Sequence, residues 1–550
     1  MGQRTPSLER TEVDLLIIGG GITGAGAARD AARRGLTVVV ADRDDIAGGT
    51  SSRSSKLVHG GLRYLEQGEV SLVFEAVAER RILQEIAPHL VQPLPFLLPV
   101  FEDSRRSLFT INIGMWLYDG LSLFRSPKFH TKLNAKKVLA VEPQLRSNGL
   151  KGAPVYYDCA TDDARLTLET MLDAERAGAE IRTHTDVTRL VRENGRVVGA
   201  EMTDLLSGTT QTVRARAVLN ATGPWSDETR SLDGGNGPAR MRPTKGIHIV
   251  LDADRVPVNH AIVCLHPKDG RVFFTIPWGE QTYIGTTDTD FSGDPGEVAA
   301  DAADIHYLLE ATNDYFPAIN VGPDDVIATW AGVRPLVSSE NEGDESSVSR
   351  EHLIATEPDG LITIAGVKLT TYRRMGAEVV DTIVDSLVQQ GHSLTHLRSA
   401  ETDLNPLPGA IGWPEGGSCD TVAELIAAVA PEHIGPRCAQ LLANSYGMRG
   451  INVAELVAKN PSYATPLVAG RAEIEAQVIW AAREELAGTV SDVMVRRTQL
   501  FFRDQDQGLS AVDRVAELLG IELGWTDEQR AQYGAAYRAE VARSRAWRAD

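Results

Sequence analysis

Three glycines near the start of the chain have the spacing of a turn that binds a pyrophosphate. They are Gly19, Gly21 and Gly24, and they lie between an apolar run at 15–18 and a helical pattern at 23–34. In such a turn the first glycine makes the sharp bend, the second lets the backbone touch the phosphates, and the third lets the helix pack on the strand. The start of the helix adds free N–H groups and a positive dipole end. The spacing therefore predicts a strand, a phosphate-binding turn and a helix.

A carboxylate follows at the place where this pattern needs one. Residues 37–41 form a second apolar run, and Asp42 comes directly after it, 18 residues beyond Gly24. An acidic residue at this place accepts hydrogen bonds from the two hydroxyls of a ribose. A glycine-rich turn in an ordinary α/β domain is the alternative interpretation. Strand, glycines, helix, strand and acid in this order favour a dinucleotide site.

The loop that follows Asp42 is rich in polar side chains. Residues 51–65, SSRSSKLVHGGLRYL, bring four serines together with basic residues and two adjacent glycines. Small hydroxyl side chains let a flat ring system approach closely, and the glycines permit a tight turn or contact with a ligand. We therefore expect this loop to line a ligand site beside the cofactor. A surface turn that precedes a helix is the alternative.

Basic residues lie beside apolar, strand-like sequence at three later places. They are Arg334 in GVRPL, Arg350 in SREHL and Lys368 in GVKLTTYR. Each alone would more often be a surface charge, but their shared context is more informative. Together with Arg63 they could hold a phosphate dianion, which guanidinium groups bind through paired hydrogen bonds. The GVKLTTYR segment also opens a helix, whose N-terminus suits a phosphate or a flavin carbonyl.

The composition narrows the partners that the protein could have. The chain has 550 residues and a formal net charge of −20 at pH 7. Nucleic acid binding is disfavoured, because a phosphate backbone needs clustered Lys and Arg. The four cysteines are scattered without a C-x-x-C pair, so we expect no metal site. So few thiols in a long chain suggest a reducing, cytoplasmic compartment.

The longest apolar tract, residues 107–124, is a poor transmembrane helix, because it contains Asn112, Asp119 and two glycines. Basic residues flank it at positions 105, 106, 125 and 128. An interfacial helix at a membrane surface is therefore one interpretation. A core helix rich in aromatic residues is the interpretation that the sequence favours.

Periodicity and proline content divide the chain into parts. Strand and helix patterns alternate over 12–90, which is typical of an α/β domain, and short strand-like runs dominate 240–340. Prolines at 406, 408 and 414 mark a linker, after which helical periodicity continues to the end. The length agrees with three or four structural units.

Several motifs together resemble one enzyme family. The most distinctive is TSSRSSKLVHGGLRYLE at 50–66. The others are GGGITGAG (19–26 with the preceding strand), DDARL (162–166), NATGPW (220–225), IGTTDTD (284–290), GVRPL (332–336), GVKLTTYR (366–373) and VRRTQL (495–500). They span nearly the whole chain, which resembles the FAD-dependent, respiratory glycerol-3-phosphate dehydrogenase family.

The resemblance implies an α/β fold: a Rossmann-like FAD-binding domain joined to an antiparallel substrate-binding sheet, on the plan of glycine and amino-acid oxidases, with an all-helical C-terminal cap. We assign residues 12–398 to the first two parts. The FAD part would comprise 12–90, 155–240 and 325–395, and the substrate sheet 91–154 and 240–325. A linker at 399–415 would lead to the helical domain at 416–550.

The resemblance also implies roles for single residues. The ADP half of FAD would be bound by Gly19, Gly21, Gly24 and Asp42. The residues near the isoalloxazine end would be Thr50, Ser51, Ser55 and Lys56. Further cofactor contacts would come from Ala221, Thr222, Gly223, Lys368, Leu369 and Thr370. The substrate site would consist of His59, Arg63, Tyr64, Arg334 and Arg350.

One position departs from the family pattern. Val367 stands where the family commonly has a glycine before the lysine of the last motif. A β-branched residue would resist a positive φ at that place. The departure concerns the geometry of this loop and leaves the overall assignment unchanged.

The expected reaction is oxidation of sn-glycerol 3-phosphate to dihydroxyacetone phosphate, with hydride transfer from carbon 2 to FAD. An arginine stays protonated in proteins, whereas a histidine titrates near neutral pH, so His59 is favoured as the base; a structural role is its alternative. The resemblance implies a quinone acceptor and a peripheral position on the cytoplasmic face of the membrane. Oxygen as the acceptor and the oligomeric state stay open.

Two rival functions belong to other classes. An amine or amino-acid oxidase on the same plan would bind a carboxylate, for which one arginine suffices, so four basic positions argue against it. A non-catalytic nucleotide-binding or regulatory module is the second rival, and the set of motifs disfavours it.

Overall fold

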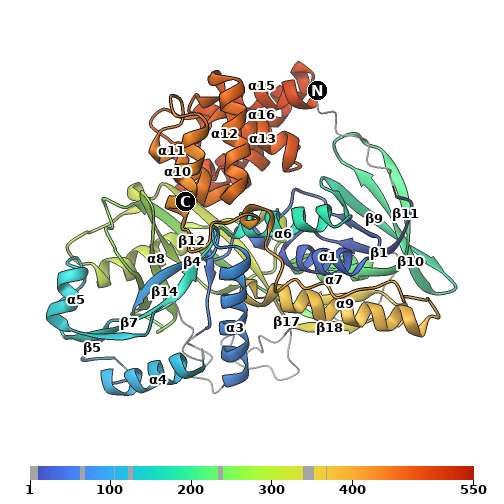
Figure 1. The fold of residues 1–550 in the computed structure, drawn as a ribbon. Helices are drawn as coiled ribbons and strands as arrows, with labels where there is room; N and C mark the ends of the chain where they lie inside the picture. Colours follow the sequence, from blue (N-terminus) through green and yellow to red (C-terminus); the bar gives the residue numbers. More distant parts are fainter. Residues whose placement is uncertain are drawn as a thin grey trace.

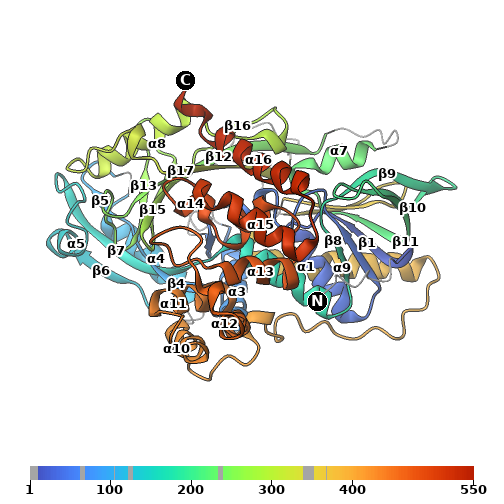
Figure 2. The same cartoon turned by 90° about the horizontal axis from the view of Figure 1, so that it is seen from above.

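The computed structural model describes residues 10–61, 69–104, 106–121, 128–232, 239–337, 352–366 and 368–549. Two β-sheets lie side by side, and helices from the C-terminal part of the chain cover both on one side (Figures 1 and 2). The predicted α/β region, second sheet and helical C-terminal part are confirmed.

The first sheet has the N-terminal strand at its centre. β1 (Glu12–Ile18) runs parallel to β11 (Thr210–Asn220) on one side and to β2 (Val38–Ala41) on the other. β1 and β2 are buried along almost their whole length, as unbroken apolar runs require in a covered parallel sheet. The outer strands are β8 (Glu180–Arg182), β19 (Ile362–Ala365) and β18 (Leu353–Thr356), and β11 also pairs with the hairpin of β9 (Thr185–Glu193) and β10 (Arg196–Asp204).

Helices pack closely on this sheet through small residues. α1 (Ile22–Arg34) lies against α6 (Asp163–Arg176) and α9 (Tyr372–Gln389). A Cβ added to Gly376 would lie 2.6 Å from the backbone of Gly26, so glycines set how closely α9 approaches α1. Because α1 begins directly after the glycine turn, this packing fixes the turn at the carboxyl edge of the sheet.

The second sheet is mainly antiparallel. Its longest strand, β12 (Met241–Asp252), pairs with β15 (Gln281–Gly285) and with β17 (Ala328–Val337). One pair, β4 (Gln92–Leu97) with β13 (Ala261–Leu265), is parallel. The other strands are β3 (Leu57–Val58), β5 (Val100–Phe101), β6 (Thr131–Asn134), β7 (Leu150–Ala160), β14 (Val272–Trp278) and β16 (Thr289–Asp290). The ladder between β12 and β17 extends this sheet beyond the boundary that we expected at residue 325.

Further helices surround the two sheets. They are α3 (Val70–Ile86), α4 (Leu108–Leu121), α5 (Ala135–Val141), α7 (Ser226–Ser231) and α8 (Ala302–Tyr315). The sequence favours a core helix at residues 107–124, and for one face of α4 this is wrong. Phe109 is 72% exposed, Ile113 56% and Trp116 58%, whereas Met115 and Tyr118 are buried. Helix α4 has more apolar side chains than its one buried face can hold, so the others are exposed to solvent.

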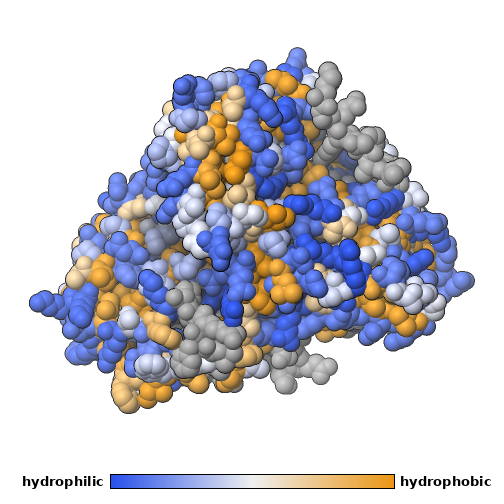
Figure 3. Space-filling view, in the orientation of Figure 1, coloured by the Kyte–Doolittle hydropathy of each residue, from blue (hydrophilic) through white to orange (hydrophobic). Residues whose placement is uncertain are grey.

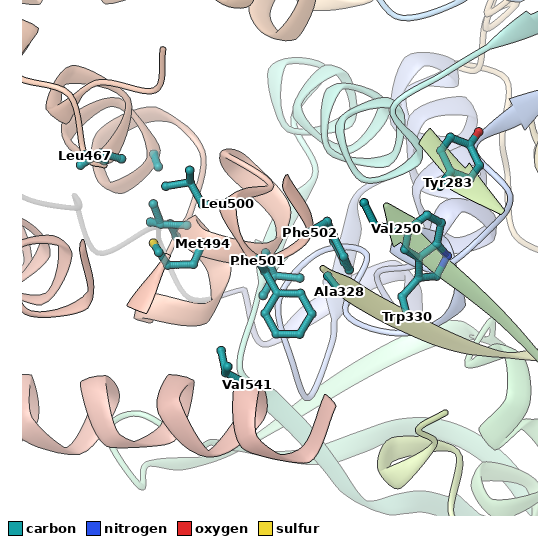
Figure 4. Packing of buried hydrophobic residues seen from close by; sticks show 14 of the residues in the cluster. Val250, Tyr283, Ala328, Trp330, Leu467, Met494, Leu500, Phe501, Phe502 and Val541 are labelled. Atoms are coloured by element: carbon teal, nitrogen blue, oxygen red, sulfur yellow. The ribbon is translucent and has the colours of Figure 1, made fainter. Parts of the chain in front are cut away.

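The C-terminal helices share a hydrophobic core with the second sheet. Their bounds are α10 (Cys419–Val429), α11 (Pro436–Tyr446), α12 (Gly450–Lys459), α13 (Glu475–Glu484), α14 (Leu500–Arg503), α15 (Val512–Leu523) and α16 (Asp527–Ser544). Phe502 of α14 lies edge-on against Trp330 of β17, with ring centroids 5.4 Å apart (Figure 4). Met494, Phe501 and Val541 belong to the same cluster. Helices α13–α16 are thus packed onto the sheet, whereas α10–α12 pack mainly around a hydrophobic cluster of their own.

A buried ion pair joins the C-terminal helices to the first sheet. His184, between β8 and β9, has its Nε2 atom 2.9 Å from Asp492 Oδ2. Burial alone would lower the pKa of His184, but the carboxylate of Asp492 outweighs it and raises the pKa to about 9. The same contact holds the pKa of Asp492 well below its usual range, against the effect of its burial.

This ion pair should make the stability of the protein depend on pH. The folded chain binds the His184 proton more tightly than the unfolded chain, whose histidine pKa is about 6.5. The stabilisation is therefore complete below about pH 6.5 and is lost as the pH rises through about 9, by roughly 1–3 kcal/mol. Thermal unfolding between pH 6.5 and 9.5 should show a falling Tm. His184→Gln should flatten that slope, while His433→Gln, at an exposed site, should keep it; equal slopes in all three proteins would contradict the assignment.

Candidate active site

A cavity of about 670 Å³ opens at the carboxyl ends of β1 and β2 and reaches β17 of the second sheet. Its volume is typical of a pocket for a small molecule or cofactor. The predicted site residues that line it are Gly19, Gly21, Asp42, Thr50, Ser51, Ser55, His59, Ala221, Thr222, Gly223, Arg334, Lys368, Leu369 and Thr370. Fold and topology thus bring segments from six separate parts of the chain to one site.

The glycine turn has the geometry of a phosphate-binding loop. Gly19 has a φ of +110°, and a Cβ there would lie 2.6 Å from the carbonyl oxygen of Ala221. A Cβ on Gly24 would lie 1.9 Å from the carbonyl oxygen of Gly19. Gly21 is the N-cap of α1 and has no side chain to cover the first N–H groups of the helix. Gly19 and Gly21 therefore line the cavity, while Gly24 supports the turn from the helix.

Asp42 stands at the end of β2 with its carboxylate beside the turn. Oδ2 accepts a hydrogen bond from the Gly20 N–H at 2.5 Å, and Oδ1 accepts one from the Asp44 N–H at 2.8 Å. Burial raises the pKa of Asp42 to about 6, although these hydrogen bonds favour the charged form. The group is therefore mostly ionised at neutral pH and can accept hydrogen bonds from a ribose.

The polar loop is tied to both sheets by its hydroxyl groups. Thr50 Oγ1 donates to a backbone carbonyl of β17 at 2.7 Å. Ser51 Oγ accepts from the N–H of Ile22, the first residue of α1, at 2.9 Å. Ser55 Oγ lies 2.9 Å from Nε2 of His248 on β12. These bonds hold the loop between the glycine turn and the second sheet.

Lys56 lies behind the loop and does not line the cavity. Its ammonium is 2.6 Å from Asp163 Oδ1, and the side chain is buried beside the rings of Trp330 and Phe502. Asp163 also accepts hydrogen bonds from the N–H and the hydroxyl of Ser54. Lys56 therefore supports the loop that we expect near the isoalloxazine end of FAD. It does not face the cavity, because its charge is directed to Asp163.

His59 and the last motif approach each other at the cavity wall. The N–H of His59 donates to Thr370 Oγ1 at 3.1 Å, and Thr370 Oγ1 is 3.2 Å from the His59 carbonyl oxygen. Thr370 belongs to a 3₁₀ turn, Leu369–Thr371, that leads into α9. Gly366, before this turn, has a φ of +78°, so a glycine supplies the left-handed residue there.

Arg334 is oriented on β17 by several partners. Its Nη1 atom lies 2.8 Å from Asp288 Oδ1, and Nη2 donates to Thr286 Oγ1 and to the carbonyl oxygen of Thr287, each at 3.0 Å. The guanidinium also contributes to a lowered pKa of His248, behind the larger effect of that ring's burial. Arg334 is thus a fixed cation in the wall of the cavity.

The NATGPW segment supplies a further wall. Ala221, Thr222 and Gly223 follow β11, and Gly223 has a φ of +56°. Trp225 lines the cavity as well, with the Arg43 guanidinium 4.6 Å from its ring. The indole N–H of Trp225 is buried without an acceptor among the described residues. A buried donor of this kind fits a site whose ligand supplies the acceptor.

Four residues singled out from the sequence lie outside the described residues. They are Arg63, Tyr64, Arg350 and Val367. Of the proposed cationic group, Arg334 and Lys368 are described, and both line the cavity.

Sequence reasoning missed His248, which stacks on Trp330 with ring centroids 4.7 Å apart and contacts Ser55. Burial, Arg334 and Lys56 lower its pKa well below the usual range, so it stays neutral. In the sequence it is a single histidine within an apolar strand, and that pattern carries no signal of a ligand site. Its neighbours come from the ladders of β12 with β15 and β17, which cannot be read from spacing.

These features together fit FAD. The glycine turn and Asp42 suit its ADP half, and the polar loop, the NATGPW segment and the unsatisfied indole surround the rest of the cavity. The residues that would hold it belong to both sheets, as a cofactor facing a substrate sheet requires.

Comparison with known families agrees with this site. A family model described as FAD dependent oxidoreductase matches residues 14–380, and one described as the C-terminal domain of alpha-glycerophosphate oxidase matches residues 400–530. Aerobic glycerol-3-phosphate dehydrogenase from Staphylococcus haemolyticus is 37% identical over 534 residues, which cover 96% of this chain and 94% of that protein. The protein of the same name from Staphylococcus aureus is also 37% identical, over 535 residues.

Solved structures give the same result. The glycerol-3-phosphate dehydrogenase of Bacillus halodurans, complexed with FAD, matches with a TM-score of 0.79 and 32% identity, covering 97% of this chain and 95% of that one. L-alpha-glycerophosphate oxidase from Mycoplasma pneumoniae shares the fold, with a TM-score of 0.54 and 16% identity over 68% of this chain and 95% of that one. The chain belongs to the FAD-dependent oxidoreductases and, among them, to the glycerol-3-phosphate dehydrogenase family.

Proposed function

We propose that the protein oxidises sn-glycerol 3-phosphate to dihydroxyacetone phosphate and passes the electrons to a quinone. The observation that carries the proposal is one cavity in which a dinucleotide turn meets two cations, Arg334 and Lys368, in a chain of net charge −20. A phosphorylated alcohol has the negative charge that such cations bind. The full-length likeness to relatives named for glycerol 3-phosphate supports this substrate.

In this proposal the basic residues bind the phosphate and His59 takes the proton of the alcohol. Arg334 and Lys368 hold the phosphate oxygens, and Arg63, Tyr64 and Arg350 join them by resemblance to the family. His59 lines the cavity, and a neutral imidazole has a ring nitrogen that can accept a proton. FAD, when bound, supplies the acceptor for the hydride.

Anaerobic reduction tests the proposal. Glycerol 3-phosphate added to the FAD-loaded protein without oxygen should bleach the flavin absorption, because the alcohol is oxidised and the flavin is reduced. A quinone analogue should then restore the colour faster than dissolved oxygen. A flavin that stays oxidised with this substrate would sink the proposal, and faster reoxidation by oxygen would make the protein an oxidase.

The rival on the same fold is an amine or amino-acid oxidase. Glycine oxidase from Geobacillus kaustophilus shares the fold, with a TM-score of 0.50 and 20% identity. Glycine and sarcosine tested beside glycerol 3-phosphate should leave the flavin oxidised. Bleaching by either amine alone would favour the rival.

We further propose that α4 contacts the membrane surface, from the cytoplasmic side. Phe109, Ile113, Trp116 and Leu117 are all about half exposed or more and recur at helical spacing, so they form one apolar face. Figure 3 shows hydrophobic surface at the lower left, where α4 lies in Figure 1. Among the described residues, no helix is both long and apolar enough to cross a bilayer.

Charge around α4 favours an anionic lipid surface as the occupant of this face. Arg106 precedes the helix, and Lys128 and Lys132 follow it, all of them exposed. A basic rim beside an apolar face with a tryptophan is typical of an interfacial helix. The rest of the molecule is acidic, so this local rim sets the orientation at the membrane. An oxidised quinone that accepts the electrons would lie in the same bilayer, which connects this proposal to the acceptor.

Replacing Trp116 by glutamate should weaken membrane binding at least fivefold, because a charge would have to enter the headgroup region with the apolar face. Cosedimentation with vesicles containing anionic phosphatidylglycerol measures this. Leu404→Glu is the matched control, since Leu404 is 72% exposed and lies elsewhere on the surface. Equal cosedimentation of the two variants would contradict the proposed contact.

A further inference from the structure

The C-terminal domain contacts the wall of the cofactor cavity from its outer side. The loop after β2 lines the cavity with Asp42, Arg43, Asp44, Gly48 and Gly49. The middle of this loop does not line it, because Asp45 there is fully buried against the C-terminal domain. One short loop therefore has a cofactor face and a domain-interface face.

Two guanidinium groups bind the carboxylate of Asp45. Arg497 holds it with a fork, Nη1 to Oδ2 at 2.6 Å and Nη2 to Oδ1 at 2.9 Å, and Arg496 adds Nε to Oδ2 at 2.6 Å. Both arginines belong to one π-helical turn, Asp492–Arg497, which overlaps the start of the VRRTQL motif. All three side chains are at most 3% exposed, so solvent does not weaken these interactions.

The serine loop that holds Ser54 and Lys56 is connected to the same π-helical turn through α6. Arg165 of α6 donates from Nη1 to Glu485 Oε1 at 2.7 Å and from Nη2 to the Arg497 carbonyl oxygen at 3.1 Å. Asp163, two residues earlier on α6, holds Lys56 and the serine loop. The loop after β2 and the serine loop thus both connect to Arg497, the first through Asp45 and the second through α6.

The backbone carries this connection to the phosphate-binding turn. The Gly48 N–H donates to the Asp45 carbonyl oxygen at 2.9 Å, and the Ala47 N–H donates to the carbonyl oxygen of Gly20 at 3.1 Å. The Gly20 N–H in turn donates to Asp42. A displacement of Asp45 would therefore move the residues that we assign to the ribose and the pyrophosphate.

We propose that Arg496 and Arg497 of the C-terminal domain are positioning residues for FAD. They hold the loop after β2 through Asp45 in the conformation that binds the cofactor. Retention of FAD thereby depends on a domain that does not contribute to the lining of the cavity among the described residues. Because binding free energies are reciprocal, FAD must equally strengthen the attachment of this turn to the first sheet.

Titration of the full-length apoprotein with FAD tests the proposal. Arg497→Gln, which removes the fork, should raise the Kd for FAD at least tenfold. The matched control is Glu169→Gln, on α6 at the same domain interface. Glu169 is fully buried, binds Arg449 at 2.6 Å and accepts from the Gly409 N–H at 2.7 Å, with no bond to either cofactor loop. The Kd of the Glu169→Gln variant for FAD should stay within twofold of the wild-type value.

An unchanged Kd in Arg497→Gln, or an equal rise in both variants, would overturn the proposal. Should Arg497→Gln not fold, Arg497→Lys keeps the charge without the fork and should raise the Kd at least threefold. Hydrogen exchange on the wild-type protein is independent of any variant. Addition of FAD should slow exchange over 488–498 while leaving 419–446 unchanged, and no slowing at 488–498 would equally overturn it. Neither readout requires turnover, so failure of the proposed substrate leaves this test intact.

Discussion

Replacing Arg334 by alanine should lower kcat/KM for glycerol 3-phosphate by at least tenfold. The guanidinium is held at the cavity wall by Asp288, Thr286 and Thr287, so it is already oriented to meet a phosphate. Each charge-assisted hydrogen bond lost contributes about 1.5–3 kcal/mol, and a tenfold change corresponds to about 1.4 kcal/mol. Steady-state kinetics with a quinone analogue measure the effect.

Two further variants make this result specific. Arg334→Lys keeps a cation without the planar fork and should fall between the wild type and alanine. Arg255→Ala removes an exposed arginine that pairs with Asp325 after β12 and should leave the kinetics unchanged. The flavin absorption of each variant confirms that FAD is retained. Wild-type kinetics in Arg334→Ala would remove this residue from the substrate site.

Replacing Gly24 by alanine should abolish the binding of FAD at micromolar concentrations. The new Cβ would lie 1.9 Å from the carbonyl oxygen of Gly19. Neither atom can move aside without moving the backbone, because the oxygen is part of the backbone and the Cβ is bonded to it. Either α1 moves away from the turn or the turn changes its conformation, and both changes disrupt the surface that binds the pyrophosphate. The ratio of flavin to protein after purification, and a titration with FAD, measure the loss.

Gly114→Ala is the matched control for this substitution. Gly114 lies inside α4, and a Cβ there would meet open space, so the variant should bind FAD normally. Circular dichroism should show folded protein for both variants, since α1 is one helix among many. A stoichiometric flavin content in Gly24→Ala would mean that the turn can shift without loss of the cofactor.

The first strand, turn and helix could be predicted closely because their signals are local. Helix α1 begins at Ile22, one residue before the predicted start, and β2 ends at Ala41, directly before Asp42. Unbroken apolar runs and a glycine spacing depend only on neighbouring residues. The same holds for the loop with Thr50, Ser51 and Ser55, whose polar character predicts a ligand wall.

The second sheet and the contacts around it could not be predicted in the same way. The extent of the sheet depends on the pairing of β12 with β17, which are separated by four other strands in the sequence. That pairing brings His248 to Ser55 and Trp330, and it places Arg334 opposite Thr244. Spacing along the chain contains no information on such registers.

Lys56 and Asp45 show that the burial and the partners of a single charged residue could not be predicted from the sequence. Each stands in a polar stretch where solvent exposure is the ordinary expectation. Lys56 is instead buried on Asp163, and Asp45 is buried on Arg496 and Arg497, more than 400 residues later in the chain. An acidic loop such as 42–45 gives no sign of which carboxylate faces the ligand and which faces another domain.

The hydrophobic core that the second sheet shares with the C-terminal helices (Figure 4) determines where the chain could be truncated. The two family models meet between residues 380 and 400, which suggests a natural point of truncation. A fragment ending there would leave Trp330 without Phe502 and Asp45 without both of its guanidinium groups. Such a product would expose apolar surface and carry an unbalanced interior charge, so it should aggregate. A boundary between two family models therefore need not coincide with a boundary between units that fold independently.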